Sequence, residues 1–205
     1  MERSDVLILV DNGHGVNTAG KRSPDGKLVE AVYTRDIALR VVVELRRLGY
    51  EADLLTPEAY DVSLLERVHR VNVKCQSRGR DKVLCVSIHC NAAGNGTEWQ
   101  KATGWEIWTS KGRTDSDVLA DHFVQMAKRH FEGKTIREWK KEDGERDKEK
   151  NFTLLKSTLC PAVLTENFFM DCKKDVKYLL SKEGVSAVIR CHVDAIVSYL
   201  ASIRN

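Results

Sequence analysis

The sequence contains four residues whose types suit metal binding and proton transfer: His14, Glu30, His89 and Glu166. Two histidines and a glutamate form a ligand set that zinc accepts, and three protein ligands leave a fourth position open for water. A further carboxylate next to such a site has the chemistry of a general acid or base. These residue types are therefore compatible with a metal site that keeps one position open.

The predicted strands place these residues in equivalent positions. His14 lies just past the strand predicted for residues 5–11, His89 ends the strand at 82–89, and Glu166 ends the strand at 162–166. Glu30 begins the helix that follows a glycine-rich loop, which can fold it back towards His14. In an open α/β sheet, sites form outside the carboxyl ends of parallel strands. We therefore expect the four side chains to converge at one edge of the sheet.

Simpler interpretations remain open for each residue taken alone. A single histidine at a strand end is commonly a hydrogen-bonded loop residue. Glu30 in the first turn of a helix is favourable to the helix dipole whether or not it binds a ligand. Glu166 follows the apolar run 162–164, where an unpaired carboxylate is costly, so an ion pair explains it as well as catalysis does.

Strands alternate with helices along the chain, which predicts an α/β fold with a twisted, mostly parallel sheet and helices on both faces. Further strands are predicted at 51–56, 104–109 and 152–155, the last two short or at an edge. Helices are predicted at 30–48, 62–76, 115–131, 174–180 and 185–203. The charged segment 133–150 is predicted to be an exposed, mobile loop that borders the substrate groove, with a short ordered piece around residues 136–139. No linker or repeat divides the chain, so residues 1–205 are expected to form one domain.

Composition excludes several classes of protein. The chain of 205 residues is 42% hydrophobic and 31% charged, with a net charge of +3. These values are typical of a globular protein, and so small a basic excess does not indicate nucleic-acid binding. No apolar run near the start is long enough to span a membrane, and no signal peptide is visible. The six cysteines form no C-x-x-C pair, and we expect mostly buried, reduced thiols.

Three segments make the prediction more specific. Residues 7–15 (LILVDNGHG), 87–92 (SIHCNA) and 161–169 (PAVLTENFF) resemble, in order, three motifs of the zinc-dependent N-acetylmuramoyl-L-alanine amidases, the type-3 cell-wall amidases. The resemblance covers nearly the whole chain. It departs from the family at Asn12, where a proline is usual, and at Pro57, where an arginine is usual.

The resemblance implies a function and a role for each residue. His14, Glu30 and His89 would bind one zinc ion, and Glu166 would be the catalytic acid and base. The substrate would be peptidoglycan, cut at the amide bond between N-acetylmuramic acid and the L-alanine of the stem peptide. A zinc peptidase acting within the stem peptide and a non-catalytic wall-binding domain on the same fold remain alternatives.

The same resemblance implies action on the cell wall. A phage-type lysin released from the cytoplasm and a cell-encoded remodelling enzyme whose export signal has been removed fit the sequence equally. No nucleic acid and no membrane insertion are expected. The sequence does not determine the oligomeric state, for which a monomer is the simplest expectation.

Neighbouring residues carry weaker expectations. Asp11 is predicted either to orient a ligand histidine or to cap a turn, and Asn91 either to bind substrate or to make a local turn bond. Trp105 is expected in the core, while Trp99 and Trp139 are predicted to lie in loops where they could stack on sugars. Cys90 follows His89 on a strand, and neighbours on a strand point to opposite faces, so the two are not expected to pair as nucleophile and base.

Overall fold

The computed structural model describes residues 5–112, 114–138 and 147–203 of the chain. Its strands are β1 (Leu7–Asn12), β2 (Glu51–Leu54), β3 (Val83–Asn91), β4 (Glu106–Thr109), β5 (Lys148–Glu149) and β6 (Ala162–Phe169). Its helices are α1 (Glu30–Arg47), α2 (Leu64–Arg78), α3 (Asp115–His130), α4 (Thr153–Ser157), α5 (Lys173–Leu179) and α6 (Lys182–Ser202). A 3₁₀ turn at Arg80–Lys82 precedes β3.

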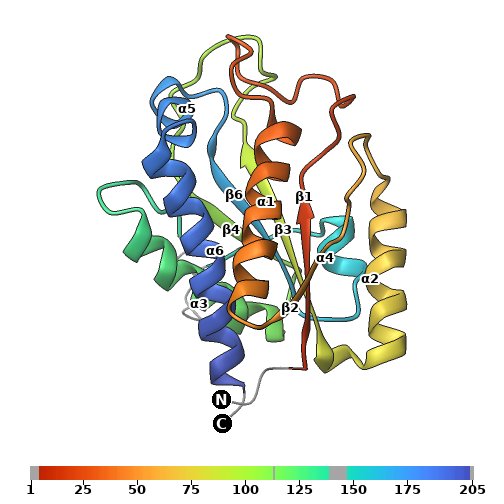
Figure 1. The fold of residues 1–205 in the computed structure, drawn as a ribbon. Coiled ribbons are helices and arrows are strands. Elements are labelled where there is room, and N and C mark those ends of the chain that lie inside the picture. Colours follow the sequence, from red (N-terminus) through yellow and green to blue (C-terminus); the bar gives the residue numbers. More distant parts are fainter. Residues whose placement is uncertain (1–4, 113, 139–146, 204–205) are drawn as a thin grey trace.

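The described strands form one sheet in the order β2-β1-β3-β6-β4-β5. Every pairing is parallel except the one between β4 and β6. Helices α1, α3 and α6 cover one face, and α2 and α4 lie on the other (Figure 1). The prediction of a mostly parallel α/β sheet with helices on both faces is confirmed.

The central strands are apolar because both of their faces are covered. All six residues of β1 are buried, and its alternate side chains enter two separate clusters. Ile8 and Val10 belong to the larger cluster under α1, α3 and α6, whereas Leu7 and Leu9 belong to the smaller one under α2 and α4. The two clusters hold the sheet between its helices and fix the positions of the strand ends.

Helix α6 is, by length and composition alone, apolar enough to cross a membrane. In the structure it packs against α3 and α1, and its residues Val188, Ile196 and Leu200 are fully buried in the larger cluster. This is the packing of a core helix. All six cysteines are also buried and free, as the sequence predicts.

Three predictions about the secondary structure need correction. The strand expected at 152–155 is wrong, because α4 forms there with Leu154 and Leu155 packed under α2. The strands β3 and β6 continue past His89 and Glu166 to Asn91 and Phe169. Both residues therefore lie within strands, near their carboxyl ends.

The segment 133–150 is not a uniformly exposed loop. Ile136 bridges Trp105, and β5 pairs with the end of β4. Asp147 is buried and accepts a hydrogen bond from Thr109. These positions are therefore ordered parts of the fold, the mobility of the segment stays a prediction, and residues 139–146 lie outside the described part of the chain.

The core contains a histidine whose neutral form the fold requires. His192 on α6 is fully buried; its Nδ1 donates to the Val188 carbonyl at 2.7 Å, and Thr165 lies 2.9 Å from its Nε2. Burial lowers the pKa of His192 to about 4, against an ordinary value of 6.5. Between these values the unfolded chain binds the additional proton, so stability is complete above pH 6.5 and falls as the pH drops.

We predict that His192→Gln removes this part of the acid sensitivity. Between pH 7 and pH 4 the free energy of unfolding of the wild type should fall by about 3 kcal/mol more than that of the variant. Urea unfolding at a series of pH values measures both curves. Parallel curves for the two proteins would show that His192 is not the group responsible.

Candidate functional site

The four residues singled out in the sequence lie at the carboxyl ends of β1, β3 and β6. His14 follows β1, and Glu30 is the first residue of α1. His89 and Glu166 are direct register partners on β3 and β6. Alternation along the strands places them on the same face as Cys85 and Leu164, which belong to the cluster under α2 and α4. The predicted convergence at one edge of the sheet is therefore observed.

Glu30 joins the two histidines. Its Oε1 lies 3.2 Å from His89 Nδ1, and its Oε2 lies 3.6 Å from His14 Nε2. One ligand atom from each of the three residues lies within 4.8 Å of the other two. The two imidazole rings meet edge to face, with centroids 5.2 Å apart. This arrangement could hold a metal ion; as ligands, the three residues remain a prediction.

The Glu30 carboxylate is 1% exposed. Its Oε1 accepts a hydrogen bond from the Cys90 amide at 3.0 Å, but Oε2 has no hydrogen-bond partner among the described residues. Burial raises the pKa of Glu30. Its neighbours lower the pKa by more, so that it lies below its ordinary value: His89 acts through a hydrogen bond and its charge, His14 through its charge, and Cys90 through its backbone amide. A buried, ionised carboxylate with an unpartnered oxygen facing two imidazoles fits a cation, as does this donor set.

The loop after β1 must come very close to its neighbours. A Cβ on Gly13 would lie 2.6 Å from His89 Nδ1, and one on Gly15 would lie 2.0 Å from the Asp61 backbone nitrogen. Between them His14 has a φ of 60°, a left-handed conformation that is uncommon for a residue with a side chain. The Gly-His-Gly sequence thus allows the histidine to turn towards Glu30 without a clash.

Asp11 supports this loop, but in neither of the two ways predicted. Its carboxylate accepts hydrogen bonds from Arg67 Nη1 at 2.7 Å and from Ser87 Oγ at 2.6 Å, and within the described residues no histidine is bonded to it. Arg67 also donates to the Asn12 carbonyl and to Asp61. The buried Asp11–Arg67 ion pair therefore ties the end of β1 to α2 and to the loop that packs on Gly15.

A bulge in β6 shapes the other side of the site. His89 pairs with Glu166 and Asn91 pairs with Phe169, so β6 has one more residue than β3 between the two pairings. Phe168 takes a φ of 63° within this bulge. The side chain of Asn167 donates to the His89 carbonyl and accepts from the Trp105 indole, which fixes His89 from behind. Asn167 lies within the motif at 161–169, but the sequence assigned no role to it.

The environment of Glu166 suits proton transfer. Its Oε2 is buried and has no hydrogen-bond partner among the described residues. Burial raises its pKa to about 8; the positive charge of His89 opposes the rise, while the carboxylates of Glu30 and Glu106 add to it. A carboxyl group whose pKa lies near neutral pH can both accept and donate a proton there.

A second charged cluster lies next to Glu166 and was missed in the sequence. The alternation of the sequence at 104–109 places Glu106 on the polar face of a half-buried strand, yet its side chain is only 3% exposed. Its carboxylate accepts from Asn91, Arg137 and Lys148. Asn91 is thus bonded across the sheet, and its Oδ1 also accepts a local hydrogen bond from the Ala92 amide. Because both cations come from far along the chain, periodicity could not reveal this cluster.

The described tryptophans lie where the sequence predicts, with Trp105 in the core and Trp99 in a loop. Trp105 is fully buried. Trp99 is partly buried beside the larger cluster, with Lys173 Nζ 5.7 Å from its ring centroid. Trp139 lies outside the described residues. Cys90 is buried in the larger cluster on the opposite face from His89, in agreement with the prediction that the two do not pair.

Comparison with known proteins gives a consistent result. A profile of the family described as N-acetylmuramoyl-L-alanine amidase matches residues 8–198. The N-acetylmuramoyl-L-alanine amidase CwlM of Bacillus licheniformis is 29% identical over 198 residues, 93% of this chain and 67% of the relative. The endolysin of Bacillus phage SPP1 is 28% identical over 201 residues, 95% of this chain and 66% of the relative. The chain thus spans about two thirds of the length of these relatives.

Solved structures share the fold. An N-acetylmuramoyl-L-alanine amidase from Clostridium difficile 630 matches with a TM-score of 0.80 at 24% identity, over 96% of this chain and 97% of that chain. The amidase AmiC2 of Nostoc punctiforme matches with a TM-score of 0.78 at 22% identity, over 98% and 99% of the two chains. The sheet order and the helical layers described above are therefore those of amidase domains.

The buried ion pair beneath the loop leads to a stability prediction. Arg67→Met should lower the free energy of unfolding by about 3–5 kcal/mol, because it leaves Asp11 charged and unpaired in the interior. Arg40→Ala removes an exposed ion pair with Asp36 and should cost about 1 kcal/mol or less. Chemical denaturation at pH 7 compares the two. Equal, small losses would mean that Asp11 and Arg67 do not hold the loop.

Proposed function

The chain belongs to the N-acetylmuramoyl-L-alanine amidase family, and we propose that it is a zinc-dependent peptidoglycan hydrolase. The bond cleaved is the amide between N-acetylmuramic acid and the L-alanine of the stem peptide. His14, Glu30 and His89 hold the zinc ion, and Glu166 is the catalytic acid and base.

The observation that carries this proposal is the state of Glu30. Its Oε2 is buried without a hydrogen bond among the described residues and faces the imidazole of His14, while Oε1 faces His89. Leaving a carboxylate oxygen in this condition is costly unless a cation joins it. Two imidazole nitrogens and one carboxylate oxygen are a set that zinc takes in hydrolases, where one position stays open.

The residues of the chain divide the work of hydrolysis. A bound zinc ion lowers the pKa of a ligated water and polarises a carbonyl group. Glu166, opposite His89 on the neighbouring strand, accepts the proton of the attacking water and passes it to the leaving nitrogen. Glu30 keeps the two histidines in place, and its negative charge favours retention of the cation. Asn167 holds the backbone of His89 and so maintains its distance from Glu166.

The site of action proposed is the bacterial cell wall, with peptidoglycan as the partner. Relatives include an amidase and a phage endolysin, which supports this assignment without separating a remodelling enzyme from a lysin. The described part of the chain contains all four proposed functional groups, at one edge of a single sheet. We therefore propose that this chain provides the catalytic domain.

Mass spectrometry of the products from purified peptidoglycan tests the proposed activity. The expected products are stem peptides with a free L-alanine amino group and glycan strands with intact N-acetylmuramic acid. A chelator should stop their release, and added zinc should restore it. Cleavage within the stem peptide would assign a peptidase instead, and binding without any cleavage would assign a wall-binding domain.

The roles of the two carboxylates can be separated by substitution. Glu166→Gln should keep the metal and the fold but lose roughly 10²- to 10⁴-fold in rate, because an amide cannot accept the proton. Glu30→Gln should instead weaken metal binding, by at least the roughly 10- to 100-fold typical of losing an outer-sphere partner. Metal content after dialysis and the rate on peptidoglycan measure the two effects.

Glu132→Gln is the matched control, since Glu132 is exposed at the end of α3 and the substitution makes the same change in charge. It should behave like the wild type. If Glu166→Gln loses the metal while Glu30→Gln retains it, the roles assigned to the two residues are exchanged.

A further inference from the structure

Glu166 is one member of a row of charged side chains that crosses the sheet. His89 pairs in register with Glu166, and Glu166 pairs in register with Glu106 on β4. Register partners project from the same face, about 5 Å apart. Ile136 bridges Trp105 next to β4, and Arg137 extends the row beyond Glu106. The row therefore runs from the proposed metal ligand His89, past Glu166, to Arg137.

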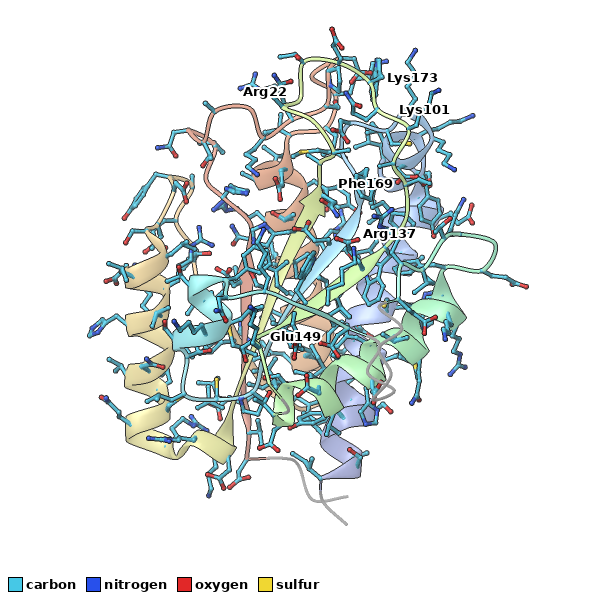
Figure 2. All side chains as sticks on the ribbon, turned by 180° about the vertical axis from the view of Figure 1, so that it is seen from behind. Arg22, Lys101, Arg137, Glu149, Phe169 and Lys173 are labelled. Atoms are coloured by element: carbon cyan, nitrogen blue, oxygen red, sulfur yellow. The ribbon has the colours of Figure 1, made fainter. Side chains whose placement is uncertain are left out.

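Arg137 is held from three sides. Its Nε donates to Glu106 Oε2 at 2.7 Å, and its backbone amide donates to the Trp105 carbonyl at 2.8 Å. Its guanidinium carbon lies 5.2 Å from the centre of the Phe169 ring. Figure 2 views this face of the sheet and shows Arg137 next to Phe169, with Arg22 and Lys101 on the loops above and Lys173 at the start of α5. The guanidinium is thus positioned before any ligand arrives.

The outer side of this guanidinium is available. The side chain of Arg137 is 38% exposed, and neither Nη1 nor Nη2 donates a hydrogen bond to any residue in the described part of the chain. Two parallel N–H groups of this kind match the two oxygens of a carboxylate. A lysine at the same place would present a point charge without that match.

The charges around Glu106 leave Arg137 with a positive surplus. Lys148 Nζ contacts the same Oε2 at 2.5 Å, and Asn91 donates to Oε1 at 2.8 Å. Lys148 is 14% exposed and turned inwards, so it compensates the buried carboxylate. One negative and two positive charges sum to one positive charge, and the exposed partner is Arg137. The cluster is therefore built to present a cation next to the proposed catalytic glutamate.

We propose that Arg137 binds a carboxylate of the stem peptide and makes the enzyme prefer stems with a free carboxylate over those with a carboxamide. The proposal rests on the amidase function proposed above. Arg137 lies one to two strand spacings from Glu166, roughly 5–10 Å. An extended peptide covers roughly 3.5 Å per residue, so the residue after L-alanine reaches Arg137 when the scissile amide lies at Glu166. Glu106 is a positioning residue that aims the guanidinium.

A pair of synthetic N-acetylmuramoyl peptides tests this inference. The two differ only in whether the residue after L-alanine bears a free backbone carboxylate or the corresponding carboxamide. The wild type should cleave the carboxylate form with at least tenfold higher kcat/KM. Arg137→Gln should lower kcat/KM for the carboxylate form to that of the carboxamide form, mainly through KM, and leave the carboxamide form nearly unchanged. Arg137→Lys should retain part of the preference.

Arg190→Gln is the matched control, since it removes an exposed arginine of α6, which packs against the other face of the sheet. It should keep the wild-type preference. Equal loss on both substrates in Arg137→Gln would overturn the inference, because it indicates a structural role. If that variant does not fold, the wild type decides: a preference that weakens with added salt supports the inference, and equal rates on both peptides overturn it.

Failure of the amidase proposal gives a different result. In that case the wild type releases L-alanine peptides from neither substrate, and the role proposed for Arg137 is overturned together with the amidase function. Cleavage of both substrates at the same rate leaves the amidase function standing and removes only the preference assigned to Arg137.

Discussion

The carboxylate of Glu30 is buried between two histidines. The elements around the site must hold this buried charge in position, and the architecture of the site depends on that constraint. Burial disfavours its charge, while the Cys90 amide and the neighbouring histidines favour it. These contacts come from β3, from the loop after β1 and from the first turn of α1. A buried charge with one oxygen unsatisfied is stable only if the surrounding elements cannot rearrange around it. Their rigidity is therefore a requirement of the site.

The fold supplies that rigidity at several separate points. Gly13 and Gly15 allow the loop after β1 to lie against His89 and the Asp61 backbone, where any side chain would collide. The Asp11–Arg67 ion pair fixes the end of β1 to α2. On the far side, the bulge at Phe168 lets Asn167 reach the His89 carbonyl. The histidine bearing the closest contact to Glu30 is thus held from both neighbouring strands.

Sequence alone was sufficient for the parts that depend on local pattern. The apolar runs of β1, β3 and β6 are long and distinct, so the strands and the four residues near their ends could be placed. The rest depends on partners distant in the chain. Glu106 alternates like an exposed residue and is buried only because Arg137 and Lys148 reach it. The pattern at 152–155 predicts a strand where α4 forms, because its apolar residues are too few to show a helical period.

We propose that a cation lies between His14, Glu30 and His89 while Glu166 lies beside it without binding it. A crystal structure of the zinc-loaded protein, with anomalous data collected at the zinc absorption edge, tests this most directly. We expect one anomalous peak within bonding distance, roughly 2.0–2.2 Å, of one atom from each of the three residues. A peak ligated by Glu166 in place of Glu30, or no peak at this edge of the sheet, would contradict it.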